Sequence, residues 1–351
     1  MSNRVFKLQD FAEVVSTSVK PEDASNYERF VGLEHYDAGE PVITRYTDTS
    51  LLVSAVKEFK ENDILIARRN VYLKRAGIVF FSGVTSGDSI ILRIPDTCID
   101  KTGIAKELAV KIIPFVLNSE HFWAYANKHA DGMNSKRISK DMLLEYEFEL
   151  SSNELEEAKS EKLWAAYRLK ESYKRLIAAT DEMVKSQFIE MFGDMKYLTS
   201  DKTMSDFFDM KAGQSITAEN IIATYDLELF PCYGGNGLRG YVTHYTHEGH
   251  YCLIGRQGAL CGNVNLTDGK FFATEHAIVV TPKISINTYW LFFALSEMNL
   301  NRFARGVAQP GLSVKQLETI PFSIPPTEEQ EQFERLYRQA DKSKYYEINE
   351  T

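Results

Sequence analysis

The sequence predicts an α+β fold of two similar mixed α/β modules that are joined by long helices of coiled-coil character. The first observation is an internal repeat, because residues 130–154 align with residues 304–328. The second is that apolar, β-branched runs precede this stretch in both halves. The third is a segment from Glu154 to Phe192 that contains neither proline nor glycine. Since 351 residues can build two hydrophobic cores, we interpret the repeat as a tandem of two modules.

Strands are predicted where apolar runs end at polar residues, glycine or proline. In the first module these runs are "DILIAR" at residues 63–68 and "IILRIP" at residues 90–95. The aligned runs of the second module are "YCLIGR" at residues 251–256 and "AIVVTP" at residues 277–282. Short apolar runs of this kind are typical of strands that are buried on both faces.

A long helix is predicted after each module. Asn153 is a suitable N-cap for the central helix and Gly193 a suitable C-cap. At 1.5 Å per residue, a straight helix of this length would span about 58 Å. After the prolines at 325–326, Thr327 and Gln330 predict a capping box for a distal helix. The predicted organisation is a first module at residues 1–152, a central helix at 153–193, a second module at 194–326 and a distal helix at 327–351.

Apolar side chains form two stripes on the central helix. Leu169, Tyr173 and Leu176 begin a stripe with the spacing of a coiled-coil seam, and a second stripe runs beside it. An ordinary interdomain linker is the alternative, but a helix recurs after both modules. We therefore expect these stripes to dock another helix or a partner protein. The residues concerned are Leu169, Tyr173, Leu176, Ile177, Met183, Val184 and Phe188 on the central helix, and Phe333 and Leu336 on the distal helix.

Composition limits the classes of function. A net charge of −9 argues against a protein that coats nucleic acid by electrostatics alone, so such binding needs a local patch or a partner. The four cysteines form no dense framework, and neither a leader nor an apolar run near 18 residues is present. These features predict reduced thiols and a cytoplasmic location.

The sequence contains no cofactor-binding motif with the secondary structure that the motif requires. "GNGLRG" at residues 235–240 fits the dinucleotide-binding pattern, but a strand-like stretch follows it where a helix is required. A hairpin or exposed loop fits better. No phosphate-binding P-loop motif occurs in the sequence. We therefore expect no cofactor on this chain.

A metal-dependent hydrolase is a second candidate class. His244, His247, His250, Cys252 and Cys261 lie close together in the sequence. Residues three apart on a strand point to opposite faces, so the three histidines would need a turn to converge. Surface histidines and buried cysteines are the simpler interpretation. We expect no metal site and no catalytic residue in this chain.

Planar polar side chains occur in corresponding loops of the two modules. Arginine, asparagine and glutamine form paired hydrogen bonds with base edges in the major groove of DNA, and lysine binds phosphates. Solvated loop charges are the alternative at any single position, but the correspondence between the modules favours DNA binding. The candidate residues are Arg68, Arg69, Asn70, Lys74, Lys136 and Arg137 in the first module, and Tyr233, Asn236, Arg239, Arg256, Gln257 and Gln309 in the second.

Several longer stretches resemble the specificity (S) subunit of type I restriction–modification systems. They include "ENDILIARRNVYLKRAG", "YGGNGLRGYV", "IGRQGALCG", "SQFIEMFGDM" and "ARGVAQPGLSVKQLETIPFSIPPTEEQ". The resemblance covers nearly the whole chain. It implies two target-recognition domains, each reading one half of a split DNA sequence, and two antiparallel helices that fix the gap between the halves.

The resemblance also implies partners. The helices would bind two methyltransferase subunits, which would carry S-adenosylmethionine, and further endonuclease subunits would complete a restriction complex. The distal helix is shorter than its counterpart, with about 25 residues from Thr327 onward. A truncated or decoy scaffold that binds methyltransferase subunits without productive DNA recognition therefore stays open as an alternative.

Overall fold

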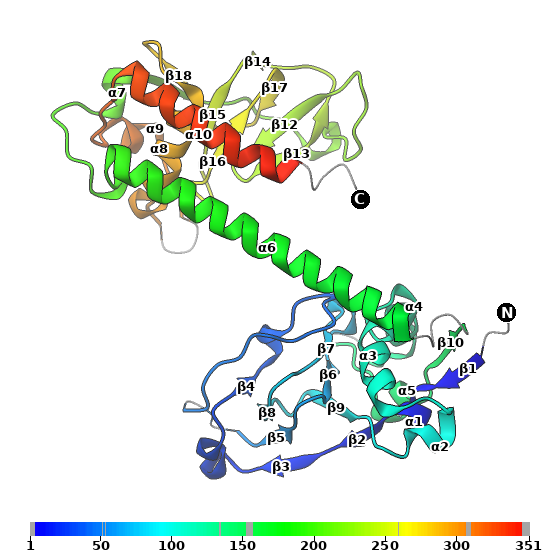
Figure 1. Cartoon of the computed structure of the whole chain (residues 1–351). Helices are drawn as coiled ribbons and strands as arrows, with labels where there is room; N and C mark the ends of the chain where they lie inside the picture. The colour runs from blue at the N-terminus through cyan, green and yellow to red at the C-terminus, as the bar shows by residue number, and fades with distance from the viewer. Residues whose placement is uncertain are drawn as a thin grey trace. The chain divides into compact units, whose positions relative to one another are not determined.

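The computed structural model of the chain describes residues 4–50, 52, 54–132, 135–151, 157–258, 260–306 and 310–345, without the side chains of 158 and 341–345. The chain forms two compact units, unit 1 up to Glu171 and unit 2 from Ser172. The boundary lies within helix α6 (Glu157–Phe192), which is green in Figure 1. The first turns of α6 therefore belong to unit 1 and its last turns to unit 2.

Each unit contains a four-stranded antiparallel sheet of the same topology. In unit 1 the strand order is β2 (Glu13–Val15), β9 (Ser89–Arg93), β6 (Ile64–Ala67) and β7 (Ala76–Ile78). In unit 2 it is β11 (Phe208–Ala212), β18 (Ala277–Pro282), β15 (Tyr251–Gly255) and β16 (Val264–Thr267). The strands predicted from the four apolar runs are β6, β9, β15 and β18, so these predictions are confirmed. We call this the shared sheet.

The shared sheet is covered on both faces, which explains its continuous apolar runs. Along β6, Ile64 and Ile66 enter one core cluster, whereas Leu65 enters a second cluster on the other face. Along β15, Ile254 and Leu253 are divided between two clusters in the same way. Successive strand residues point to opposite faces, so a strand between two cores must be apolar at every position.

The second sheets of the two units agree in three neighbouring strands and differ in where the fourth strand is added. In unit 1 the order is β3 (Thr17–Val19), β5 (Val56–Phe59), β8 (Gly83–Thr85) and β4 (Phe30–Val31). In unit 2 it is β13 (Gly237–Val242), β12 (Phe230–Gly234), β17 (Lys270–Ala273) and β14 (His247–Glu248). Both β8 and β17 have one parallel and one antiparallel neighbour. The fourth strand lies at opposite edges of the two sheets. In unit 1 it is β3, which pairs with β5, and in unit 2 it is β13, which pairs with β12.

Helices close both units. Unit 1 contains α1 (Leu8–Phe11), α2 (Cys98–Thr102), α3 (Lys106–Val116), α4 (Glu120–His129) and α5 (Lys140–Leu144), and unit 2 contains α7 (Met204–Phe207), α8 (Thr288–Glu297), α9 (Val314–Glu318) and α10 (Thr327–Tyr345). Short 3-10 helices lie at Pro21–Asn26, Leu33–His35, Val71–Leu73, Met195–Tyr197, Ala218–Asn220 and Leu300–Phe303. The repeat is visible in α5 and α9, because the Ser139 and Ser313 hydroxyls cap their N-termini alike.

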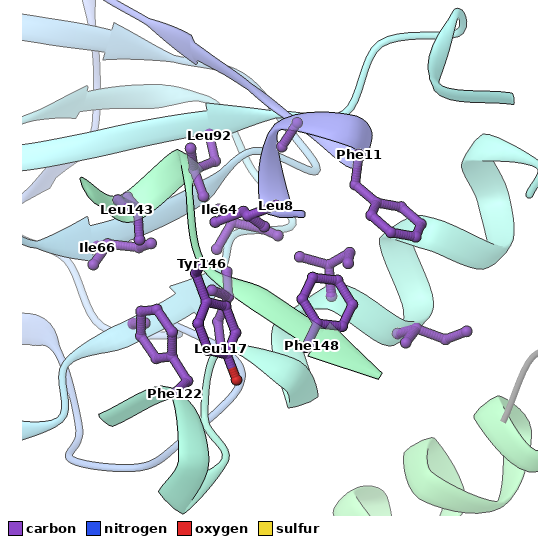
Figure 2. Packing of buried hydrophobic residues seen from close by; sticks show 14 of the residues in the cluster. Leu8, Phe11, Ile64, Ile66, Leu92, Leu117, Phe122, Leu143, Tyr146 and Phe148 are labelled. Atoms are coloured by element: carbon purple, nitrogen blue, oxygen red, sulfur yellow. The ribbon is translucent and has the colours of Figure 1, made fainter. Parts of the chain in front are cut away.

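Figure 2 shows buried side chains of unit 1, to which segments far apart in the sequence contribute, from Leu8 to Phe148. Strand β1 (Arg4–Lys7) pairs with β10 (Glu147–Leu150), and Phe6 lies opposite Phe148. The Phe11 ring is 5.2 Å from that of Phe6 and 5.7 Å from that of Phe148. Aromatic pairs of this kind add to the free energy gained from burial.

The predicted ends of the long helices are only partly confirmed. Gly193 adopts φ 80° and its N–H donates to Ile189 O over 2.8 Å, as expected of a C-cap. Asn153 lies outside the described residues. The capping box at Thr327 is not formed as predicted, because the Gln330 side chain is hydrogen-bonded to Pro325 O and Asn287 N. Within the described ranges, every helix is too short or too polar to cross a bilayer.

Candidate nucleic-acid interface

Two loops of unit 1 meet in a hydrogen-bonded backbone frame. The Asn70 N–H donates to Lys136 O over 2.7 Å, and the Ile138 N–H donates to Arg68 O over 3.0 Å. The loop after β6 is thereby joined to the loop before α5. A further antiparallel bridge links Arg137 to Asp131, at the end of α4. Five predicted residues, Arg68, Arg69, Asn70, Lys136 and Arg137, are consequently brought together on this frame.

Unit 2 repeats the frame with equivalent hydrogen bonds. The Gly258 N–H donates to Pro310 O over 3.1 Å, and the Leu312 N–H donates to Arg256 O over 2.8 Å. The bridge between Gly311 and Arg305 corresponds to the one between Arg137 and Asp131. We call these two structures the loop frames. Their side chains differ, but the backbone that presents the side chains is the same.

The guanidinium group of Arg69 is held by two neighbours in the first loop frame. Its Nη1 lies 3.0 Å from Asp88 Oδ2, and its Nε donates to Ser135 Oγ over 3.5 Å. The Ser135 hydroxyl in turn donates to Asn70 Oδ1 over 3.2 Å. Asp88 and Ser135 were missed by the sequence reasoning, because neither belongs to a recognisable motif. They restrict the guanidinium group before any ligand binds.

The two basic residues that follow this loop have different surroundings. Lys74 Nζ forms an ion pair with Glu120 Oε1 at 2.5 Å. Arg75 turns inward and donates to Leu33 O and Arg69 O. Arg75 therefore stabilises the loop backbone.

Lys57 lies next to the first loop frame and was not among the residues predicted from the sequence. The Lys57 Nζ donates to Gly87 O over 2.9 Å and to Ser89 O over 2.8 Å. Burial lowers the pKa of Lys57, and the nearby charge of Arg68 lowers it further. The positive charge of this site is thus denser than the loop sequence alone indicates.

In the second loop frame, His276 replaces Asp88. The Arg256 N–H donates to His276 O over 2.9 Å, as the Arg68 N–H donates to Asp88 O over 3.0 Å. The His276 ring lies 3.4 Å from Glu275 Oε1, and the Gln257 side chain is exposed. Gln309 lies outside the described residues.

The glycine-rich hairpin β12–β13 adjoins the second loop frame. A Cβ atom added to Gly235 would lie 2.7 Å from His276 O, and one added to Gly255 would overlap Gly235 O. These glycines allow the close approach of two backbones. The hairpin prediction for residues 235–240 is therefore confirmed. Asn236 is exposed at its turn.

The other two hairpin candidates lie along the strands. Arg239 is exposed and its aliphatic chain covers Gly234. Tyr233 packs on Phe271, with 6.0 Å between ring centroids, and burial raises the pKa of its hydroxyl. Tyr233 is therefore partly a core residue, unlike the exposed base-contacting residue that was expected.

Comparison with known proteins assigns unit 2 to a family. Residues 199–342 match the family described as type I restriction modification DNA specificity domain. Unit 2 is a type I restriction modification DNA specificity domain. The chain is 49% identical over 130 residues to the type I restriction enzyme EcoprrI specificity subunit of Escherichia coli. That match covers 37% of this chain and 32% of the relative, so the chain spans about a third of the relative's length.

The predicted fold class is confirmed over both units. The fold is similar to the crystal structure of a type-I restriction-modification system S subunit from M. genitalium, with a TM-score of 0.62 and 16% sequence identity. This similarity covers 99% of the chain and 92% of that structure. Both units therefore have the mixed helix-and-sheet fold of that structure.

The histidines and cysteines of the specificity domain do not form a cluster. The His247 ring stacks on Phe271, His250 pairs with Asp268, and Cys252 is fully buried. Burial also raises the pKa of Cys252 far above the ordinary value of a thiol. Among the described residues, no group of three or more His, Cys, Asp or Glu side chains is placed to hold a metal ion.

The predicted docking residues separate into two groups. Val184, Phe188 and Phe333 are buried within the specificity domain, and the Phe188 and Phe333 rings are 5.0 Å apart. These three therefore pack α6 and α10 against each other and the domain core, which is the docking of another helix that was expected as one of two roles. Leu336 and Ile177 are half-buried. The remaining residues are exposed and form what we call the α6 stripe, namely Leu169, Tyr173, Leu176 and Met183.

Proposed function

We propose that the chain is the DNA sequence-recognition subunit of a type I restriction–modification complex. Each unit reads one half of a split DNA target through its loop frame. The observation that carries this proposal is that both units present planar and basic side chains on the same backbone frame. The specificity domain of unit 2 supports it further.

In this proposal the loop frames supply the base contacts. Arg69 and Asn70 in unit 1, and Arg256 and Gln257 in unit 2, carry groups that form paired hydrogen bonds with guanine or adenine. Lys136 binds the phosphate backbone, which sets the register without reading sequence. Residues already held by neighbours lose less conformational freedom on binding.

The chemistry is assigned to partner proteins. Methyltransferase subunits, two per complex, bind the α6 stripe and supply S-adenosylmethionine for methylation of adenine, and endonuclease subunits complete a restriction complex in the cytoplasm. The chain itself is non-catalytic in this proposal. The net charge of −9 supports the division, because the partners then provide most of the contact with phosphates.

Mapping of DNA methylation in cells with the matching methyltransferase subunit tests the proposal. With this chain present, a split motif with a fixed gap should become adenine-methylated, and without it the motif should stay unmodified. The Arg69→Ala variant should relax one half of the motif, and Gln257→Ala the other half. Absence of any motif that depends on the chain would refute the proposal.

A scaffold without productive DNA recognition is the second candidate. The exposed α6 stripe is compatible with it, because a partner that binds there does not need the loop frames. It predicts that the methyltransferase subunit co-purifies with the chain although no motif is methylated. A ratio of one partner per chain would support this candidate against the first.

A further inference from the structure

The two loop frames have an arginine in common. Arg68 is the first residue after β6, and Arg256 is the first residue after β15. We call these two residues the shared arginines. Around them the aligned side chains differ, and the differing pairs are Arg69 and Gln257, Asn70 and Gly258, Asp88 and His276, Lys136 and Pro310, and Arg137 and Gly311. Base edges vary along DNA whereas phosphates repeat at every step, so a side chain that both frames keep suits a phosphate contact.

The backbone holds the shared arginines in equivalent positions. In each frame the N–H of the arginine donates to the carbonyl of the residue that precedes β9 or β18. The carbonyl of the arginine accepts an N–H from the loop before α5 or α9. Hydrogen bonds on both sides of the residue fix its backbone, so each side chain starts from the same point of its own frame.

The guanidinium groups of the shared arginines are left without partners. Within the described residues, neither group forms a hydrogen bond or an ion pair, although both side chains are half-buried. Arg68 Nε is itself buried. By contrast, Arg93 of the same unit donates twice to Asp63, over 2.8 and 2.6 Å. A buried N–H without an acceptor costs free energy, so these groups gain most from a ligand that supplies one.

The charges around the shared arginines also favour an anion. In unit 1, burial lowers the pKa of Lys57 and the charge of Arg68 lowers it further, so two cations lie close together. The carboxylate of Asp88 is already engaged by Arg69 over 3.0 Å.

In unit 2, the carboxylate beside the frame is engaged in the same way. Glu275 Oε1 lies 3.4 Å from His276 Nε2, and no described carboxylate is paired with Arg256. A phosphate has several acceptor oxygens, and a guanidinium group can donate to two of them at once.

We propose that the shared arginines bind phosphates of the DNA backbone, one in each half of the target. This inference rests on the proposed function of the loop frames and narrows it. Arg256 moves from the base contacts to the phosphate contacts, and Gln257 remains as the base reader beside it. In unit 1 the same division leaves the base contacts to Arg69 and Asn70. Each frame thus holds the backbone with the residue that both units share and reads sequence with residues that differ.

Binding of the full chain to a pool of random DNA duplexes tests the proposal. Titration at a series of KCl concentrations gives the salt dependence, and sequencing of the bound duplexes gives the base preference. Arg68→Gln and Arg256→Gln should each weaken binding about tenfold, because a hydrogen-bonded charge is lost. Each should also reduce the slope of log K against log [KCl] by about 0.9, the contribution of one phosphate. The base preference should stay as in wild type.

Matched controls remove an arginine outside the frames. Arg45→Gln in unit 1 and Arg338→Gln in unit 2 each delete an exposed arginine that is paired with a carboxylate. Both should leave the slope and the affinity unchanged. The melting temperature should not fall in Arg68→Gln or Arg256→Gln, because their guanidinium groups hold no described neighbour. Arg68→Lys keeps the charge and should keep the slope.

The other outcomes separate this inference from the proposed function. A base position that loses its preference in either glutamine variant would make that arginine a base reader and overturn the inference. Unchanged affinity and slope would also overturn it, while a base preference in wild type would leave the proposed function standing. A reduced slope in a chain without any base preference would support the phosphate contact and refute the reading of a split target.

Ethylation of DNA phosphates provides a test that needs no variant of the protein. Ethylation of one phosphate in each half of the target should interfere with binding of wild type, because it removes the negative charge. The interference should disappear at one phosphate in Arg68→Gln and at another in Arg256→Gln. An interference pattern that is the same for wild type and both variants would overturn the inference.

Discussion

Asp88 Oδ2 lies 3.0 Å from Arg69 Nη1, and the carbonyl oxygen of the same aspartate accepts the N–H of Arg68 at 3.0 Å. One residue thus fixes both the backbone and a side chain of the first loop frame. The equivalent His276 keeps the backbone contact with Arg256. The two frames therefore share their scaffold and differ in the group that orients the neighbouring side chain.

We predict that Asp88→Ala alters DNA preference more than stability. Without the carboxylate, the Arg69 guanidinium group loses its fixed orientation, and discrimination at one base pair should fall by about 1–3 kcal/mol. The pair is partly exposed, so the free energy of unfolding should change by less than about 1 kcal/mol. Binding to a library of half-site variants measures the first effect, with Asp96→Ala as a surface control. An unchanged base preference would contradict the prediction.

Phe333→Ala should destabilise the specificity domain by about 3–5 kcal/mol, because it removes a fully buried ring from the contact between α10, α8 and α6. Leu176→Ala, at an exposed position of α6, should cost less than about 0.5 kcal/mol. Urea unfolding of both variants gives the comparison. Equal free energies of unfolding would mean that α10 does not contribute to the core.

Gly255→Ala should disrupt the contact between the β12–β13 hairpin and the second loop frame. The added methyl group would overlap Gly235 O, and backbone atoms yield less readily than the end of a side chain. We expect a loss of about 1–3 kcal/mol in the free energy of unfolding. Gly87→Ala is the control, because open space surrounds a Cβ atom there. A variant as stable as wild type would show that the hairpin is free to move away.

Alkaline pH should destabilise unit 1 through Tyr36. Burial raises the pKa of this tyrosine to about 12, although hydrogen bonds with Ser89 and Thr85 act in the opposite direction. Its hydroxyl lies 2.9 Å from Ser89 Oγ. The folded pKa exceeds the unfolded value near 10, so the contribution is complete below about pH 10 and is lost as the pH rises toward 12.

The difference between wild type and Tyr36→Phe isolates this effect. Between pH 9 and 12, the stability of wild type should fall more steeply, by up to about 2–3 kcal/mol in total. Parallel curves for the two proteins would show that the Tyr36 hydroxyl titrates as it does in the unfolded chain.

The sequence predicted the parts of the fold that repeat. Strands β6 and β15 are apolar at every position because both of their faces are buried, and this pattern can be recognised in the sequence alone. The alignment of Lys136–Arg137 with Pro310–Gly311 also placed two loops at equivalent positions. Edge strands β3 and β13 were not predictable, because their pairing depends on which side of the second sheet stays open.

The orienting residues and the covered helix faces required the structure. Asp88 and His276 are equivalent in space but share no side-chain chemistry, so no residue pattern connects them. Periodicity correctly marked Val184 and Phe188 as apolar. It does not specify what covers an apolar face, so the structure was needed to decide between the two expected roles, docking of another helix and docking of a partner protein.

The pairing of β1 with β10 has a consequence for biosynthesis. Arg4 lies opposite Leu150, so the first strand has no partner until the ribosome has released nearly the whole of unit 1. Pairing over such a separation closes a long loop, which slows folding, and the unpaired strand is exposed to aggregation meanwhile. Helix α6, whose hydrogen bonds are local, can form as soon as it leaves the exit tunnel. The nascent chain would thus acquire its central helix at about the time its first strand finds its partner.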